Sequence, residues 1–285
     1  MTVVHTISEC RAARAKLPGR VALVPTMGAL HVGHLSLIAR AKELAQSVVV
    51  SIFVNPTQFG PREDFQKYPR PIMADLEKCQ AAGVDLVFNP ATEEMYRPGA
   101  PDVVVDLPAL TGVLEGKHRP GHFKGVCQVV AKLFNVVQPH VACFGQKDFQ
   151  QFRVLAAMVE TLDFPLEMVA CATLREKDGL AMSSRNQYLS PDERQRALSI
   201  SRALMLAQGE AKGGVKQTNR LLTTMQNVLL DAGTLGRIPM SIDYVAAVDP
   251  KTLKNVETVS GPTVLAIAAR VGSTRLIDNV VIETI

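Results

Sequence analysis

The chain of 285 residues has no tryptophan, few aromatic residues and no long apolar run. Nowhere do 18 consecutive apolar residues occur, so we expect no transmembrane helix. With so few aromatic residues and no polybasic run, the chain also lacks the usual means of binding a membrane surface. Residues 1–10 have neither a basic flank nor a long apolar run, so we expect no signal peptide and a cytoplasmic location.

The cysteines are odd in number and widely spaced, and none forms a C-x-x-C pair. They are Cys10, Cys79, Cys127, Cys143 and Cys171. This spacing indicates neither a disulfide framework nor a zinc site. We therefore expect reduced cysteines that are mostly buried as small hydrophobic side chains.

An excess of charge of one sign is also missing. Lysine and arginine number 31 against 27 aspartates and glutamates, which gives a net charge of +4. This balance is too mild to indicate a nucleic acid as the main partner, and it fits small anionic substrates better. No G-x-G-x-x-G motif occurs, which counts against a dinucleotide cofactor.

Short apolar segments alternate with segments of helical periodicity in the first part of the chain. Strands are expected at 20–24, 48–54, 84–88, 141–144 and 166–172. Helices are expected from near His34, over 71–82, over 125–137 and up to about residue 162. This alternation predicts an α/β fold with a Rossmann-like parallel sheet and helices on both faces. An edge strand at 103–107 and loops at 61–68 and 115–125 complete this part.

The last part of the chain has a different order of elements. Helices are expected at 191–212 and 215–232, and strands follow at 242–248, 263–269 and 274–283. Helices followed by strands predict a smaller C-terminal α+β domain. We place the two domains at 1–178 and 179–285, and expect the second to be a lid or a dimerisation surface.

The sequence Pro-Thr-Met-Gly-Ala-Leu-His-Val-Gly-His, from Pro25 to His34, joins the first strand to the first helix. Gly28 and Gly33 permit a sharp turn and close approach of a ligand to the backbone. Unpaired amides at a helix start favour an anion, and His31 and His34 are spaced to share one face. The stretch is either a phosphate-binding turn or a tight turn with two surface histidines.

Four further loops carry polar residues suited to such a site. Gln58 follows the second strand and can both donate and accept hydrogen bonds, although a glutamine in this place is more often part of a plain loop. Lys147 follows a later strand as a point charge suited to a triphosphate, beside Asp148, which is either a metal ligand or a helix cap. Residues 175–186 form a glycine-containing cationic loop that can close over phosphates or simply link two domains. The loop at 115–125 is either an anion clamp or a solvated turn.

Five motifs in this order resemble one family. They are PTMGALHVGH, VNPTQFG, RPGHFKGV, FGQKDFQQ and DGLAMSSRN. Together they resemble the pantoate:β-alanine ligases (pantothenate synthetases) of the HxGH nucleotidyltransferase superfamily, over nearly the whole chain. The resemblance implies an AMP-forming condensation of (R)-pantoate with β-alanine through a pantoyl adenylate, with ATP as co-substrate, Mg²⁺ and a homodimer. From the composition we expect neither a nucleic-acid nor a membrane partner.

The resemblance also implies roles for individual residues. Catalysis is expected from His34, His31, Lys147 and Arg185, with His34 assigned in the family as a proton donor. ATP binding is expected from Met27, Gly28, Ala29, Leu30, His31, Val32, Gly33, His34, Gly145, Gln146, Lys147, Asp148, Leu174, Met182, Ser183, Ser184 and Arg185. Gln58 and Gln151 are expected to bind pantoate, with Gln58 near β-alanine as well.

Two departures from the family pattern concern charge. Gln146 stands where the family commonly has a glutamate beside the lysine. Where related chains show adjacent acidic residues, this chain has Met73-Ala74-Asp75, so Asp75 is the remaining candidate for the metal.

The residues are compatible with the implied chemistry and with two alternatives. Pantoate attacks as an ionised carboxylate, so the first step needs charge stabilisation and no general base. The second step needs a neutral amine, and no residue is an obvious base for it. The alternatives are another HxGH adenylyltransferase acting on a phosphorylated acceptor and a non-catalytic nucleotide- or RNA-binding module.

Overall fold

The computed structural model describes residues 1–61, 63–234 and 238–283. It divides into two compact units. The first comprises Met1–Gly112, Arg119–Gln146 and Val154–Ala172; the second comprises Val113–His118, Lys147–Arg153 and Thr173–Ile285. The domain boundary after residue 178 stays a prediction. In the structure, the short segments Val113–His118 and Lys147–Arg153 also belong to the C-terminal unit.

The first unit contains a six-stranded sheet in the order β1-β4-β3-β2-β5-β6, in which every pairing is parallel. The strands are β1 (Thr2–Val4), β2 (Val21–Thr26), β3 (Ser47–Ile52), β4 (Leu86–Phe88), β5 (Val141–Gly145) and β6 (Glu167–Cys171). The predicted parallel α/β sheet is therefore confirmed. Helices between the strands are α2 (Val32–Leu44), α3 (Ile72–Ala81), α7 (His122–Val137) and α8 (Phe149–Thr161).

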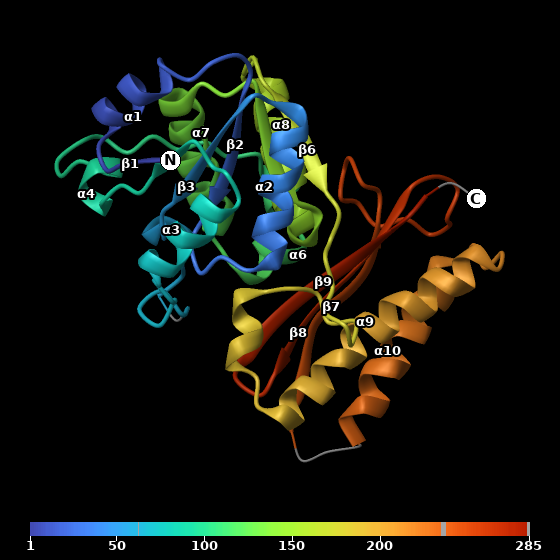
Figure 1. Ribbon diagram of the computed structural model, residues 1–285. Helices are drawn as coiled ribbons and strands as arrows, with labels where there is room; N and C mark the ends of the chain where they lie inside the picture. The colour runs from blue at the N-terminus through green and yellow to red at the C-terminus, as the bar shows by residue number, and fades with distance from the viewer. Residues whose placement is uncertain (62, 235–237, 284–285) are drawn as a thin grey trace. The chain divides into compact units, whose positions relative to one another are not determined.

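Both faces of this sheet are apolar, and both are covered. In β2, Ala22 and Val24 pack into a cluster with Leu37 and Ile38 of α2, and Leu23 between them is fully buried as well. Successive strand residues point to opposite faces, so a strand that is buried throughout needs helices on both sides. Figure 1 shows α2 running along the sheet, and α7 also contacts β2.

Two N-terminal elements lay outside the predicted set. β1 forms the sheet edge beside β4, and α1 (Ile7–Arg14) follows it. The hydroxyl of Thr6 accepts from the Glu9 amide, and the Glu9 carboxylate accepts from the Thr6 amide. This capping box is a sequence signal for a helix start that the apolar periodicity alone did not reveal.

The edge strand predicted at 103–107 is wrong. That segment has no regular secondary structure, and Val103 and Val104 are 66% and 65% exposed. The edge strands of the sheet are β1 and β6, and the β-branched run pairs with neither of them. Strand propensity is realised only where a neighbouring strand and a buried face are available.

The loop predicted at 115–125 is also wrong, because it contains parts of two helices. α6 covers Leu114–His118, and α7 begins at His122. Gly121, whose φ is +83°, precedes α7. Short helices α4 (Thr92–Met95) and α5 (Pro108–Thr111) precede them. Turns occupy the described part of 61–68, with Tyr68 buried, and Arg62 lies outside the described residues.

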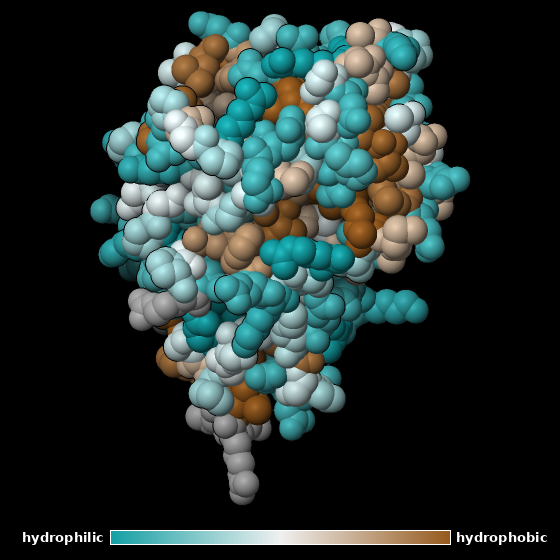
Figure 2. Space-filling view, turned by 90° about the vertical axis from the view of Figure 1, so that its left-hand side faces the viewer, coloured by the Kyte–Doolittle hydropathy of each residue, from teal (hydrophilic) through white to brown (hydrophobic). Residues whose placement is uncertain are grey.

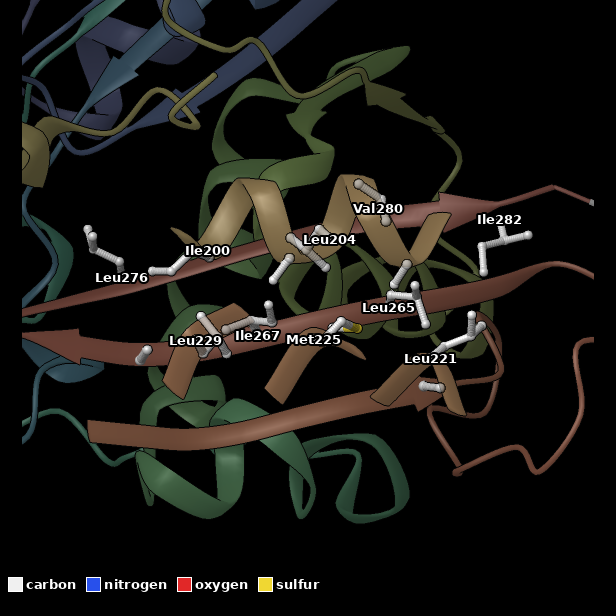
Figure 3. Packing of buried hydrophobic residues seen from close by; sticks show 14 of the residues in the cluster. Ile200, Leu204, Leu221, Met225, Leu229, Leu265, Ile267, Leu276, Val280 and Ile282 are labelled. Carbon is white, nitrogen blue, oxygen red and sulfur yellow. The ribbon is translucent and has the colours of Figure 1, made fainter. Parts of the chain in front are cut away.

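The second unit packs two helices against an antiparallel sheet. α9 (Pro191–Lys212) and α10 (Thr218–Thr234) precede β7 (Met240–Val248), β8 (Thr263–Val271) and β9 (Thr274–Ile282), which pair in the order β7-β8-β9. Figure 3 shows Leu204, Met225 and Ile267 meeting in the core between helices and sheet. The predicted C-terminal α+β arrangement is confirmed.

The five cysteines are free and buried, as expected. Burial raises the pKa of Cys10 to about 11 and that of Cys127 to about 12. A hydrogen bond with Cys143 instead lowers the pKa of Cys171. Because all five thiols are buried and closed to the reagent, we expect no rapid reaction of the native chain with an aromatic disulfide reagent at neutral pH. All five thiols react after denaturation. A rapidly reacting thiol in the folded protein contradicts this expectation.

Helices long and apolar enough to cross a membrane are absent from the described part of the chain. Figure 2 shows one face on which hydrophilic residues predominate and apolar residues gather in several smaller areas.

Candidate active site

The histidine motif forms the turn between β2 and α2, at the carboxyl end of a central strand. The turn needs two residues in the left-handed region, Gly28 with φ +79° and Ala29 with φ +50°. A Cβ at position 28 would lie 3.0 Å from Asp75 Oδ2 and 3.1 Å from Ile52 Cγ2. Glycine is therefore required at position 28 by both its φ and its neighbours.

The turn is held by two side chains of α3. The buried Asp75 carboxylate accepts from the amides of Ala29 (2.8 Å) and Leu30 (2.7 Å), and Lys78 Nζ donates to the Leu30 carbonyl at 2.7 Å. These bonds compensate for the strain at Ala29. They give Asp75 a structural role, and its role as a metal ligand stays a prediction that they do not favour.

The two histidines cap α2, which begins at Val32, two residues before the predicted start. The Gly33 amide donates to His31 Nδ1 at 3.1 Å, and the His31 amide donates to His34 Nδ1 at 3.3 Å. An amide can only donate, so each Nδ1 is the acceptor and the ring proton is on Nε2. Each imidazole thus carries an Nε2–H donor at the start of a helix, where anions are favoured.

Gln58 ends the short helix η1 (Pro56–Gln58) after β3, and its side chain is buried rather than part of a plain loop. Its Oε1 accepts from Asn55 Nδ2 at 3.1 Å, and its Nε2 lies 3.0 Å from the sulfur of Met27. The contact with Met27 brings Gln58 beside the histidine turn. Both segments lie at the same edge of the sheet because β2 and β3 are parallel neighbours.

The motif at 119–126 approaches Gln58 from the other side. Arg119 pairs with Glu63 through two hydrogen bonds of 2.7 Å, and the buried His122 places its ring 2.8 Å from the Gln58 carbonyl. Burial alone would raise the pKa of Glu63, but the hydrogen bonds and charge of Arg119 lower it. The carboxylate is therefore ionised, and the guanidinium is engaged by it rather than presented as an anion clamp.

The last candidate site residues of the first unit are Gly145 and Gln146, at the end of β5. β5 is the other neighbour of β2 in the parallel sheet, with Leu23 opposite Ala142. The carboxyl end of β5 therefore lies at the same edge as the histidine turn and Gln58. This is the edge at which open parallel sheets bind ligands.

The second unit contains the candidate site residues Lys147, Asp148 and Gln151. Lys147 Nζ lies 3.9 Å from Asp148 Oδ1, and the Lys147 carbonyl accepts from Asn279 Nδ2 of β9 at 2.7 Å. The Asp148 carboxylate is half exposed, in the short helix η2 (Gln146–Asp148) just before α8. Lys147 thus follows β5 in sequence while its backbone is held by the C-terminal sheet.

The loop at 175–186 is held by ion pairs. Arg175 donates to both oxygens of Asp278, at 2.6 and 3.0 Å, and Arg194 of α9 bridges Glu176 and Asp178 at 2.7 Å each. Arg175 is therefore engaged within the protein and does not add to a phosphate-binding charge. These ion pairs hold the start of the loop, and its closing over phosphates stays a prediction.

The ATP-binding residues expected in this loop sit on a defined backbone. The Met182 amide donates to the Leu174 carbonyl at 2.9 Å, and Ser183 caps η3 (Ser184–Tyr188) by accepting from the Arg185 amide at 3.3 Å. The ATP-binding roles of Leu174 and 182–185 stay predictions.

Several residues that shape the site were not identified from the sequence. Asn55, Glu63, Lys78 and His122 act through contacts with residues far away in the chain. A polar loop after β3 was the only signal for Asn55. Groups of three or more potential metal ligands are absent among residues 1–61, 63–234 and 238–283.

Comparisons with known proteins agree along the whole chain. The family described as pantoate-beta-alanine ligase matches residues 2–281. The pantothenate synthetase of Acidobacterium capsulatum is 49% identical over 99% of this chain and 97% of its own length, and that of Rubrobacter xylanophilus is 52% identical over 91% and 90%.

Solved structures lead to the same family. The crystal structure of pantothenate synthetase from Thermus thermophilus has a TM-score of 0.91 and 45% identity, covering 98% of this chain and 99% of that one. The pantoate-beta-alanine ligase from Francisella tularensis, complexed with Beta-gamma ATP and β-alanine, has a TM-score of 0.80 and 31% identity over 100% and 98%. A match from residue 2 to residue 281, with relatives near half identity, shows that this chain belongs to the pantoate-beta-alanine ligase family.

Proposed function

We propose that the chain condenses (R)-pantoate with β-alanine at the expense of ATP, forming pantothenate, AMP and pyrophosphate through a pantoyl adenylate. The observation that carries this conclusion is the pair of histidines that cap α2 through Nδ1, so that each ring has its donor at Nε2, in a chain of this family. Such donors match the charge that develops when a carboxylate attacks a phosphate.

The first step needs no general base. A pantoate carboxylate oxygen bonds to the α-phosphorus of ATP, and the bond from that phosphorus to the β-phosphate oxygen breaks, releasing pyrophosphate. Negative charge grows on the α-phosphate and on the leaving group. His31 and His34 stabilise it as hydrogen-bond donors, and Lys147 and Arg185 supply positive charge.

The second step is an acyl transfer. The neutral amine of β-alanine attacks the pantoyl carbonyl carbon, AMP leaves with the bridging oxygen, and the amine loses a proton. No described residue is assigned as the base, and holding the amine beside the activated carbonyl supplies most of the rate. Gln58 and Gln151 are assigned to pantoate.

The remaining expected residues keep their proposed roles toward ATP. In the first unit these are Met27 to His34, Gly145 and Gln146, and in the second Lys147, Asp148, Leu174 and Met182 to Arg185. We assign ATP binding and pantoate binding mainly to 1–178, and a lid or dimerisation role to 179–285. A homodimer is expected, which light scattering after gel filtration measures.

Magnesium is proposed as a companion of the triphosphate. Mg²⁺ keeps several waters and binds phosphates with one or two carboxylates, so it does not need a cluster of protein ligands. Asp148, half exposed beside Lys147, fits this need better than Asp75, whose two oxygens already accept backbone amides. When bound, the ion neutralises phosphate charge.

The function is tested by following AMP with ATP, pantoate and Mg²⁺, with and without β-alanine. We expect AMP and pantothenate to form together and only when β-alanine is present. Pyrophosphate release that requires a phosphorylated acceptor instead indicates another adenylyltransferase. Nucleotide binding without turnover indicates a binding module.

A further inference from the structure

The segment Arg119–Val126 has no role in the reaction as described so far, although the polar side chains of Arg119 and His122 suggest one. Arg119 is satisfied by Glu63, and its Nη1 lies 3.1 Å from His122 Nε2. A guanidinium can only donate, so Nε2 is the acceptor and the His122 proton is on Nδ1. Nδ1 therefore donates to the Gln58 carbonyl, 2.8 Å away.

The same segment packs closely against the main chain of η1. A Cβ at Gly125 would lie 2.3 Å from the Thr57 carbonyl oxygen and 2.7 Å from the Gln58 amide nitrogen. The Gly125 carbonyl accepts from Asn55 Nδ2, which also donates to Gln58 Oε1. The start of α7 thus contacts Gln58 in three ways. His122 bonds its backbone carbonyl, Gly125 packs against its backbone nitrogen, and the Gly125 carbonyl holds Asn55, which bonds the Gln58 side chain.

One polar group of Gln58 is left with a weak partner. Its Nε2 lies near the thioether sulfur of Met27, and sulfur is a poor acceptor. Gln58 is only 8% exposed, so a buried amide donor stands ready for a better acceptor. A hydroxyl or carboxylate oxygen of the substrate satisfies that need, and its affinity depends on how accurately the amide is held.

We propose that Glu63, Arg119 and His122 are positioning residues that aim the Gln58 amide at the oxygen-rich acid substrate. Glu63 holds Arg119, and Arg119 selects the His122 tautomer. His122 fixes the Gln58 carbonyl at 2.8 Å, and Arg119 Nη2 adds a longer bond of 3.4 Å to the same oxygen. The three are assigned no contact of their own with the substrate and act through Gln58. The inference rests on the proposed function, because pantoate is the acid whose binding reports on Gln58.

The experiment compares His122→Phe with His122→Asn. Phenylalanine fills the space but has no donor, whereas the asparagine amide nitrogen replaces Nδ1. We expect the KM for pantoate to rise by about 10- to 100-fold in H122F, the range for a lost hydrogen bond that places a buried group. The KM for ATP changes less than about threefold, and H122N stays within about fivefold of the wild type.

A cycle with Gln58→Ala separates positioning from a general structural effect. If His122 acts through Gln58, H122F adds little to the KM for pantoate in the Q58A background. A full additional effect there, equal losses for ATP and pantoate, or an unchanged KM for pantoate overturns the proposal. Loss of pantoate-dependent turnover in the wild type instead overturns the proposed function.

Folding of the variants is followed by circular dichroism and thermal unfolding. If H122F does not fold, Glu63→Gln tests the same chain of contacts from Glu63, whose side chain is partly exposed. We expect a three- to tenfold rise in the KM for pantoate from the looser Arg119, with the KM for ATP unchanged. An unchanged KM for pantoate in E63Q then overturns the proposal.

Discussion

Replacing His34 by alanine is expected to slow adenylate formation by about 10²-fold or more, the usual cost of one lost transition-state donor. The fold is expected to persist, because the α2 cap loses the bond that His34 accepts from the His31 amide but keeps the bond from the Gly33 amide to His31. The rate is measured as pantoate-dependent pyrophosphate release in a single turnover, with circular dichroism as the control for folding. Near-normal turnover of H34A contradicts the assigned role.

A second substitution at the same position separates charge stabilisation from proton transfer. Glutamine is a usual residue at this place in a capping box, so His34→Gln retains an acceptor for the His31 amide and an N–H donor. If His34 acts as a hydrogen-bond donor, H34Q keeps its rate within about tenfold of the wild type. If a proton must leave the ring, H34Q is as slow as H34A, because an amide does not give up a proton.

Removing the Glu115 side chain is expected to destabilise the second unit by about 3 kcal/mol, since it leaves a largely buried cation with less compensation. Glu115 is 5% exposed and accepts from Arg275 Nη1 (2.6 Å) and Nη2 (2.7 Å) and from the Tyr244 hydroxyl (3.0 Å). Asp243 still pairs with Arg275 at 2.7 Å, which keeps the loss below the maximum for a buried pair.

The measurement is urea unfolding of Glu115→Ala beside a matched surface control. Glu167→Ala removes an ion pair with Arg20 whose side chains are 58% and 52% exposed, and we expect at most about 1 kcal/mol there. Equal losses in the two variants contradict the buried role of Glu115. Burial raises the pKa of Tyr244, as does the Glu115 charge beside it, so the phenol stays protonated and donates to Glu115 at neutral pH.

Regular elements with a strong local period were predictable from the sequence. The helix at Pro191–Lys212 has the predicted bounds, because a Ser190 cap, a first-turn proline and a Gly213 stop all agree. The prediction of a strand at 103–107 was wrong because valines form a strand only where a neighbouring strand is available for pairing. The loop predicted over 115–118 was wrong because a glycine such as Gly116 is typical of loops. In the structure these residues are helical, and the Glu115 side chain binds Arg275, which is far away in the chain.

The candidate site was predictable as a set of residue types but not as a set of contacts. The motif identified His31 and His34, yet histidines as cap residues follow no common pattern, so their tautomers needed the structure. Asp75 was considered for a metal, and its bonds to Ala29 and Leu30 join residues 45 and more positions apart. Sequence spacing carries no information on such pairs.

The central claim is that the acid is activated by transfer of AMP to its carboxylate, and the fate of the carboxylate oxygens tests it directly. With ATP, Mg²⁺, β-alanine and pantoate labelled with ¹⁸O in both carboxylate oxygens, we expect one labelled oxygen in the phosphate of AMP and one in the amide carbonyl of pantothenate. AMP without label, or ADP with labelled inorganic phosphate, contradicts a pantoyl adenylate.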